Sequence, residues 1–271
     1  MGSKKLTAKN SDKFLLYEEA VQNVEFEAGV IRRFYKKLRD REPLTLKEDF
    51  CGSFALCCEW VQKNKAASAV GVDLEGKVLD WGRKHNLAKL KDSEKKRIQL
   101  HKDDVNNVTS PKVDIVAAFN FSYWTFRTRP ELLKYFRTCY KSLKQNGILV
   151  LDAFGGSAAQ LENDDEPEER ECEGFTYVWE HAKFHPVTHY MECKIHFEFD
   201  DGSRMRNAFK YQWRLWNPPE ITELLTEAGF DDVQWFFEGT DHKTGEGDGV
   251  YRRSLKGEAA ETWLAYAVAL K

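Results

Sequence analysis

Acidic residues recur in the first half of the chain at points where apolar runs end. Glu48 and Asp49 follow "LTLK", Asp73 follows "ASAVGV", and Asp103 and Asp104 follow "RIQLHK". A carboxylate in such a place can accept hydrogen bonds from ribose hydroxyls or from an adenine amino group. The series therefore indicates a nucleoside ligand, although each acid taken alone could equally be a helix N-cap.

The segment "KEDFCGSFALCCEWV", residues 47–61, has the outline of a nucleotide-binding turn. Gly52 would let the backbone approach a ligand, and the helix that follows would direct its positive end to the same point. Phe50 and Phe54 stand where the dinucleotide fingerprint has glycines. Their bulk argues against NAD and against phosphate, and it favours a cofactor without phosphate. An ordinary strand-to-helix corner is the alternative.

Polar and aromatic residues cluster in "FNFSYW", residues 119–124, after another apolar run. Asn120 and Tyr123 are the candidates to orient an acceptor or to take its proton. His181 and His185 are further candidate bases, but a surface or turn position is the more common place for such histidines.

The elements that must position these residues alternate between strand and helix patterns. After a helix predicted over Phe14–Arg39, apolar runs predict strands at "LTL", Ala67–Gly76, "RIQLHKDDV", Val113–Trp124 and Gly147–Gly156. Helical spacing lies between them, at Ala55–Gln62, Val78–Leu90 and Pro130–Leu143. This alternation predicts an α/β fold with a doubly wound parallel sheet, which binds ligands at the carboxyl ends of its strands.

The pattern changes after Gly156. "ENDDEPEEREC" reads as a solvated acidic loop, and three alternating segments between Phe175 and Trp216 predict an inserted antiparallel meander. "NPPEITELLTEAGF" predicts a helix, and "DDVQWFFEG" and "TWLAYAVAL" predict two closing strands. We therefore expect an N-terminal helical cap (1–44), a main domain (45–156 and 217–271) and an inserted substrate-side subdomain (157–216).

Composition limits the class of protein. The 271 residues are 42% hydrophobic and 13% aromatic, enough for a packed core, and the formal net charge of -3 argues against a nucleic-acid partner. None of the six cysteines forms a C-x-x-C pair, so free thiols in a reducing compartment are expected rather than disulfides or a metal site. No apolar run could span a membrane, and we expect a cytoplasmic protein.

The motifs together resemble the class I S-adenosylmethionine-dependent methyltransferases. "LKEDFCGSF", "AVGVDLE", "KDDV", "VDIVAAFNFSYW", "NGILVLDAFGG" and "LLTEAGFDDVQWF" match successive family motifs, from about Thr45 onward. The chain is most similar to an uncharacterised group with an "EDFCGT" motif and a "YVWE" to "IHFEF" insertion. It departs from the family pattern in the missing glycines at Phe50 and Phe54, and in Ser53, where Thr is usual.

The resemblance implies a Rossmann-like seven-stranded sheet, mostly parallel with an antiparallel C-terminal strand, that binds S-adenosylmethionine. The implied cofactor residues are Glu48 or Asp49, of which only one can face the site, and Cys51, Gly52, Ser53, Asp73, Leu74, Asp104, Val105 and Phe119. No metal is implied.

The implied reaction is an in-line displacement, in which the protein mainly aligns the reactants in a dry pocket. A base is needed only if the acceptor arrives protonated. We expect catalytic roles for Asn120 and Tyr123, and acceptor contacts from Tyr17, Gln22, Trp124 and Trp179. A small-molecule acceptor is expected. A protein or RNA methyltransferase, or a noncatalytic adenosyl-ligand binder, are the alternatives, and the oligomeric state stays open.

Overall fold

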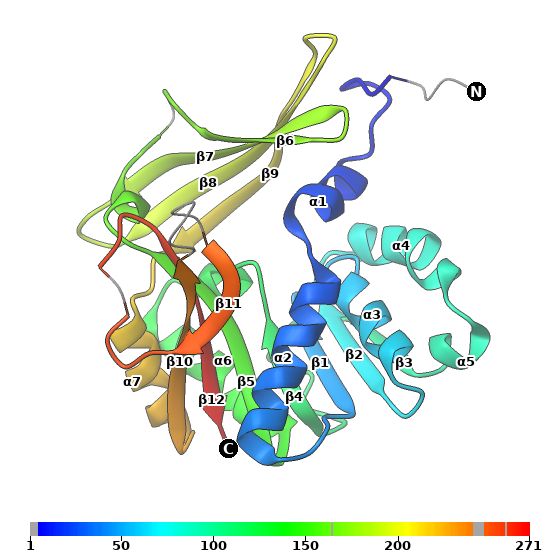
Figure 1. The fold of residues 1–271 in the computed structure, drawn as a ribbon, viewed down its shortest axis with the longest axis vertical. Coiled ribbons are helices and arrows are strands. Elements are labelled where there is room, and N and C mark those ends of the chain that lie inside the picture. Colours follow the sequence, from blue (N-terminus) through cyan, green and yellow to red (C-terminus); the bar gives the residue numbers. More distant parts are fainter. Residues whose placement is uncertain (1–4, 164, 241–246, 258) are drawn as a thin grey trace. The chain divides into compact units, whose positions relative to one another are not determined.

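The computed structural model describes residues 5–163, 165–240, 247–257 and 259–271 (Figure 1). The chain forms two compact units, each with its own sheet. The larger unit contains Val24–Tyr123, Thr128–Ala159 and Asn217–Lys271. The smaller unit contains the segments up to Asn23, Trp124–Arg127 and Gln160–Trp216.

The larger unit is built on an eight-stranded sheet of order β11-β10-β12-β5-β4-β1-β2-β3. The first five strands along the chain run parallel, β12 is antiparallel to β5 and β10, and β11 is antiparallel to β10. The strands are β1 (Thr45–Asp49), β2 (Ser68–Asp73), β3 (Ile98–Lys102), β4 (Val113–Ala118), β5 (Leu143–Gly155), β10 (Asp232–Thr240), β11 (Gly247–Arg253) and β12 (Trp263–Leu270).

This sheet confirms the predicted Rossmann-like fold class, mostly parallel with an antiparallel C-terminal strand. The strand count differs, because seven strands were predicted and β11 adds an eighth at the edge. Central strands such as β4, which is buried at every position and apolar except for Asp114, were easy to predict from their apolar runs. The edge strand β11, "GDGVYRR", lacks such a run.

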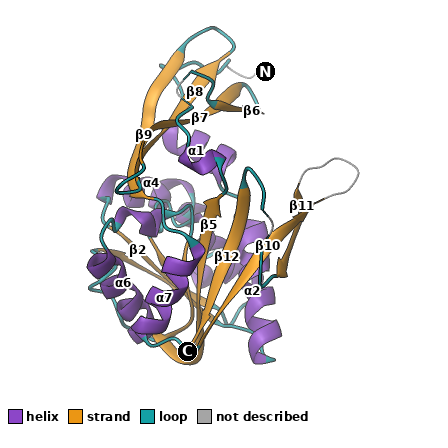
Figure 2. Cartoon of the chain, turned by 90° about the vertical axis from the view of Figure 1, so that its left-hand side faces the viewer, coloured by secondary structure: helices purple, strands orange, loops and turns teal. Residues whose placement is uncertain are grey.

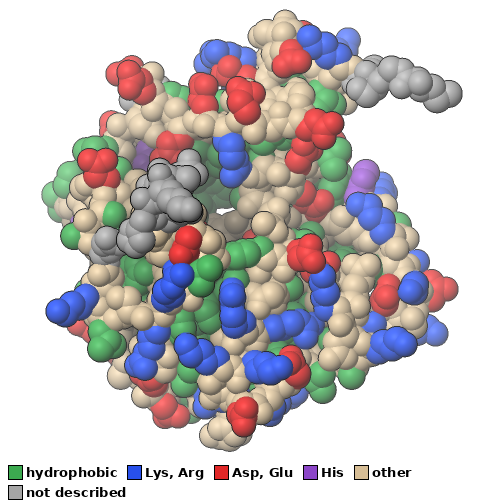
Figure 3. All heavy atoms as spheres, viewed as in Figure 1, with side chains coloured by type: hydrophobic (Ala, Val, Ile, Leu, Met, Phe, Trp, Pro, Cys, Tyr) green, Lys and Arg blue, Asp and Glu red, His purple; other side chains and the backbone are tan. Residues whose placement is uncertain are grey.

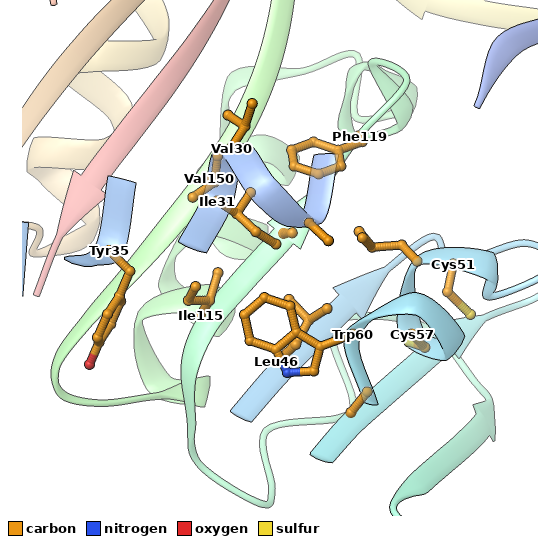
Figure 4. Close-up of a cluster of buried hydrophobic side chains, with 14 of the residues drawn as sticks. Val30, Ile31, Tyr35, Leu46, Cys51, Cys57, Trp60, Ile115, Phe119 and Val150 are labelled. Atoms are coloured by element: carbon orange, nitrogen blue, oxygen red, sulfur yellow. The ribbon is translucent and has the colours of Figure 1, made fainter. Parts of the chain in front are cut away.

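Helices cover both faces of this sheet, with α2 on one side and α6 and α7 on the other (Figure 2). The core on the α2 side joins side chains of α2, α3, β1, β4 and β5, among them Ile31, Trp60 and Val150 (Figure 4). The helices of this unit are α2 (Val24–Arg39), α3 (Ala55–Lys63), α4 (Gly76–His85), α5 (Asp92–Lys95), α6 (Arg129–Ser142) and α7 (Pro218–Ala228). Short 3₁₀ turns occur at Leu87–Lys89, Ser122–Thr125 and Ala158–Gln160.

The single helix predicted over Phe14–Arg39 is wrong, because it is divided. Helix α1 (Lys13–Val21) ends at Gln22, whose backbone is extended, and α2 begins at Val24. No Gly or Pro marks the break. The two helices bury different sides, since α1 packs Leu16 and Ala20 into the core of the smaller unit. Helix α1 thus belongs to the smaller unit and α2 to the larger one.

The smaller unit holds α1 and a four-stranded antiparallel sheet of order β6-β7-β8-β9. Its strands are β6 (Glu168–Cys172), β7 (Phe175–His185), β8 (Tyr190–Phe199) and β9 (Arg204–Arg214). The predicted meander is present. The prediction of a solvated loop over "ENDDEPEEREC" is wrong in its last part, since β6 pairs with β7 there. Exposed β6 has no apolar alternation, so its pairing could not be seen in its own residues.

The six cysteines are free thiols, and all except Cys172 are buried. Among the described residues, no group of His, Cys, Asp and Glu side chains could hold a metal ion. No described helix has the length and apolar character needed to cross a membrane.

Candidate functional site

The loop after β1 has the backbone of a glycine-rich turn, built largely without glycine. Phe50, Gly52 and Phe54 all have left-handed φ angles, of 56°, 52° and 49°. This conformation costs a residue other than glycine about 1–2 kcal/mol. Tertiary contacts must therefore hold the two phenylalanines, and the Phe54 ring is in fact fully buried.

Hydrogen bonds from neighbouring elements fix this loop. Gly52 N–H donates to Asp73 Oδ2 at 2.8 Å, and Cys51 N–H donates to the carbonyl of Val72 at 3.0 Å. The Asn86 side-chain amide donates to the carbonyl of Ser53 at 3.2 Å. Helix α4 approaches this carbonyl so closely that a Cβ on Gly82 would lie 2.4 Å from it. The loop is thus tied to β2 and α4.

Glu48 and Asp49 point to opposite faces of the sheet, as strand alternation requires. Glu48 Oε2 accepts the N–H of Cys57, in the first turn of α3, at 3.1 Å, and burial raises the pKa of Glu48 to about 8. Asp49 lies on the α6 side, paired with the buried Lys47 at 2.6 Å and accepting the Tyr135 hydroxyl at 3.1 Å. Glu48 is therefore the acid on the same face as the loop and the start of α3.

Asp73 lies at the end of β2 and organises its surroundings through both oxygens. Oδ2 accepts from Gly52 and Oδ1 accepts the N–H of Glu75 at 2.8 Å. Burial raises the pKa of Asp73. The next residue, Leu74, has 67% of its surface exposed, a large fraction for a leucine beside a buried strand. An acceptor carboxylate and an uncovered apolar side chain therefore stand next to each other.

Asp104 and Val105 follow β3. Asp104 Oδ1 accepts the backbone N–H of Asn106 at 2.8 Å and its side-chain amide at 3.0 Å, so the carboxylate is held in a turn. Val105 is buried and Asp104 is half-buried. The alternative of a turn-forming acid is thus observed for Asp104, with Oδ2 outside these two bonds.

The loop after β4 is held by an acid that the sequence motifs did not single out. Asp152, in β5, accepts the N–H of Asn120 at 2.6 Å and that of Phe121 at 3.0 Å. Tyr123 is fully buried, and its hydroxyl donates to the carbonyl of Asp152 at 2.9 Å. This placement favours a supporting role for Tyr123, whereas Asn120 is half-buried. The predicted cofactor residue Phe119 is buried against Tyr266.

The other predicted cofactor residues turn their side chains inward. The Cys51 thiol is buried, and a Cβ on Gly71 would lie 3.0 Å from its sulfur. Ser53 is also buried. These two residues could therefore meet a ligand only through their backbone.

All four predicted acceptor residues belong to the smaller unit. Trp124 and Trp179 each lie 6.1 Å from the ring of Trp213, so the fold brings these two together. Tyr17 packs on Phe209 at 4.8 Å. Gln22 ends α1, and its buried Oε1 accepts no hydrogen bond within the described part of the chain.

The candidate bases of the meander are differently placed. His181 is buried, which lowers its pKa, while His185 is exposed near Tyr190.

The smaller unit also has a polar hollow of about 350 Å³ lined by Thr125, Arg127, Lys210 and Gln212, none of which was predicted as a site residue.

Comparisons with known proteins give a matching family model and similar solved structures. A family model described as a methyltransferase domain matches residues 49–151. No curated protein matches the sequence. Solved structures do match it, and three of them cover nearly the whole chain.

A crystal structure of an S-adenosylmethionine-dependent methyltransferase from Clostridium acetobutylicum has a TM-score of 0.65 and 18% identity, covering 95% of this chain and 97% of that chain. The sugar N-methyltransferase KedS8 from Streptoalloteichus has a TM-score of 0.63 and 17% identity, covering 100% and 96%. CalS10, an amino pentose methyltransferase from Micromonospora echinaspora, has a TM-score of 0.66 and 14% identity, covering 99% and 99%.

The domain match runs from the last residue of β1 into β5, and it includes β2, β3 and β4 with the loops that follow them. Residues 49–151 are therefore similar to a methyltransferase domain, and the chain shares its fold with solved S-adenosylmethionine-dependent methyltransferases.

Proposed function

We propose that the protein transfers a methyl group from S-adenosylmethionine to a small-molecule acceptor, and that the acceptor atom is an amine nitrogen. The observation that carries the cofactor part is the pairing of Asp73 with Gly52, beside the exposed Leu74. It supports a site in which the backbone of the loop, an acceptor carboxylate and an apolar surface meet.

The carboxylate of Asp73 keeps hydrogen-bond acceptor sites for the hydroxyls of a ribose. A carboxylate offers about four lone-pair sites, and the N–H groups of Gly52 and Glu75 use one on each oxygen. About two sites are left, one for each ribose hydroxyl. Leu74 would pack against the adenine ring, and Asp104 would accept its amino group through the oxygen outside the turn.

S-adenosylmethionine supplies an electrophilic methyl group on a sulfonium. The chain's residues would bind the adenosine, exclude water and hold the acceptor nitrogen in line. Asn120, whose side-chain amide has no hydrogen-bond partner within the described part of the chain, is the candidate to orient the acceptor. Trp124 and Trp179, with Trp213, are the candidates for acceptor selection.

The names of two structural neighbours, a sugar N-methyltransferase and an amino pentose methyltransferase, support an amine. The face drawn in Figure 3 gives less support to nucleic acid. Acidic side chains lie among the Lys and Arg side chains in Figure 3, and Lys36–Glu42 and Lys63–Glu25 are ion pairs.

Two measurements test this proposal. Calorimetry should detect binding of S-adenosylmethionine and of its demethylated product to the protein. The absence of binding at millimolar ligand would refute the cofactor assignment. Methyl-labelled S-adenosylmethionine should then label components of a small-metabolite extract and of an amino-sugar panel. Matched sugars with hydroxyl in place of the amine are the control. Labelling of RNA or protein alone would overturn the acceptor class.

A further inference from the structure

A buried carboxylate in the second half of β5 has no place in the predicted site. Asp152 is 8% exposed, with apolar Leu151 and Ala153 on either side. In the described part of the chain no cation pairs with it. Burying a carboxylate without a counter-charge is costly, and an apolar residue would serve the sheet better. The hydrogen bonds that Asp152 accepts must therefore account for its presence.

These bonds all go to one loop. Asn120 and Phe121, which have left-handed φ angles of 54° and 56°, both donate their backbone N–H to the Asp152 carboxylate. Two successive residues in this conformation turn adjacent N–H groups to the same side, where one carboxylate can accept both. The conformation is unfavourable for Phe121, so the carboxylate stabilises a loop that would otherwise relax.

The loop has two further attachments to β5. The Tyr123 hydroxyl donates to the carbonyl of Asp152, and the ring of Phe121 packs edge-on against Phe154 at 4.7 Å. The Asn120 side chain is not among these attachments. Its position is set by the backbone on which it stands, and that backbone is held by Asp152.

We propose that Asp152 is a positioning residue for methyl transfer, which fixes the backbone of residues 119–123 and thereby places the Asn120 amide for the acceptor. This proposal rests on the proposed function, because it assigns Asn120 to the acceptor. It adds the carboxylate on the neighbouring strand that accepts the backbone N–H of Asn120.

The test compares Asp152→Asn with Asp114→Asn. Asp114 is a matched control, since it is also a buried carboxylate that accepts two successive backbone N–H groups, of Leu44 and Thr45, at 3.0 and 2.9 Å. It lies at the start of β4, at the opposite end from the loop. An asparagine at position 152 can accept only through its one oxygen, so at least one of the two bonds is lost.

Amide hydrogen exchange is measured first, because it needs no acceptor. Asp152→Asn should speed exchange at Asn120 and Phe121 by about tenfold or more, as expected for the loss of a hydrogen bond to a charged group. Asp114→Asn should leave these two amides unchanged. If Asp152→Asn does not fold, Tyr123→Phe is the second variant, because it removes the hydrogen bond from the Tyr123 hydroxyl to the carbonyl of Asp152. It should produce a smaller increase in the exchange rate of the Asn120 and Phe121 amides.

The second measurement uses calorimetry and the acceptor found by labelling. Asp152→Asn should lower kcat by about tenfold or more while cofactor affinity stays within about threefold. Unchanged exchange at Asn120 and Phe121 would overturn the proposal, and so would faster exchange with unchanged kcat. A wild-type protein that fails to bind S-adenosylmethionine would instead refute the proposed function, while exchange would still report whether Asp152 holds the loop.

Discussion

Replacing Asp73 by alanine removes two kinds of interaction at once. The protein loses the hydrogen bonds from Gly52 and Glu75, each 2.8 Å long. A bound cofactor would lose the acceptor of its ribose hydroxyls. These losses act on different equilibria, so they can be measured separately.

The magnitudes follow from the charge of the acceptor. A hydrogen bond to a charged group contributes about 1.5–3 kcal/mol, so Asp73→Ala should weaken S-adenosylmethionine binding about 10- to 150-fold. The unfolding free energy should fall by about 1–3 kcal/mol, because the N–H groups of Gly52 and Glu75 lose their partner. Asp73→Asn keeps the shape and one acceptor, and it should fall between alanine and wild type in both measurements.

Calorimetry gives the affinity and urea unfolding gives the stability. Asp12→Ala is a suitable control, because Asp12 also accepts a backbone N–H two residues ahead, from Phe14 at 2.9 Å, but at the start of α1. Asp12→Ala should lower the unfolding free energy without changing the affinity for S-adenosylmethionine. A folded Asp73→Ala protein that binds S-adenosylmethionine as tightly as wild type would show that Asp73 only supports the loop, and the ribose assignment would be withdrawn.

Three further predictions concern the same chain. Burial raises the pKa of Glu48 to about 8 from an ordinary 4.5, so its contribution to the unfolding free energy is full below pH 4.5 and is lost as the pH rises to about 8. Urea unfolding at several pH values should therefore show a smaller fall in the unfolding free energy for Glu48→Gln than for wild type, and the same fall in both proteins would contradict this prediction. Phe54→Gly should lower the unfolding free energy by roughly 3–5 kcal/mol, because the loss of the buried ring outweighs the relief of about 1–2 kcal/mol of backbone strain. The ring of Phe50 is only half-buried, so Phe50→Gly should change the unfolding free energy by no more than about 1 kcal/mol. Similar changes in both variants would refute this comparison. Trp179→Ala should reduce turnover while cofactor affinity, by calorimetry, stays within about threefold, and a parallel loss of both would remove the assignment of this aromatic cluster to acceptor selection.

The parallel sheet and the place of its acids could be predicted because local pattern decides them. Asp73 ends an apolar strand, and a strand end is visible in the sequence. The choice between Glu48 and Asp49 was open, since alternation shows that their side chains diverge but not toward which helix. The contacts of Glu48 with α3 and of Asp49 with Tyr135 in α6 show these directions, and residues 45–49 alone do not reveal such contacts.

Non-local interactions explain what could not be predicted. Asp152 acts on Asn120 and Phe121, 32 and 31 residues earlier in the chain, and its own neighbours read as an ordinary buried strand. The break between α1 and α2 carries no Gly or Pro signal, because it arises from the packing of each helix on a different core. Tyr123 illustrates the converse case, since its residue type suggested chemistry and its buried, bonded hydroxyl indicates support.

Carboxylates fix the backbone of the loops and helix starts that follow the parallel strands. Four acids in or just after the parallel strands each accept a backbone N–H from a loop or helix start: Glu48 from Cys57, Asp73 from Gly52, Asp104 from Asn106 and Asp152 from Asn120. Asp152 holds two left-handed residues, Asn120 and Phe121, through their backbone N–H groups, whereas left-handed Phe54 is held by the burial of its ring.

This arrangement also selects the ligand. Carboxylates already fixed by backbone N–H groups present their remaining lone pairs in defined directions, which suits hydroxyl and amino donors. The same negative charge would repel a phosphate placed beside Gly52, because Asp73 lies 2.8 Å from its nitrogen. A ligand that carries ribose hydroxyls, an adenine amino group and a positive sulfonium, but no phosphate, has the donors and the charge that this edge of the sheet accepts.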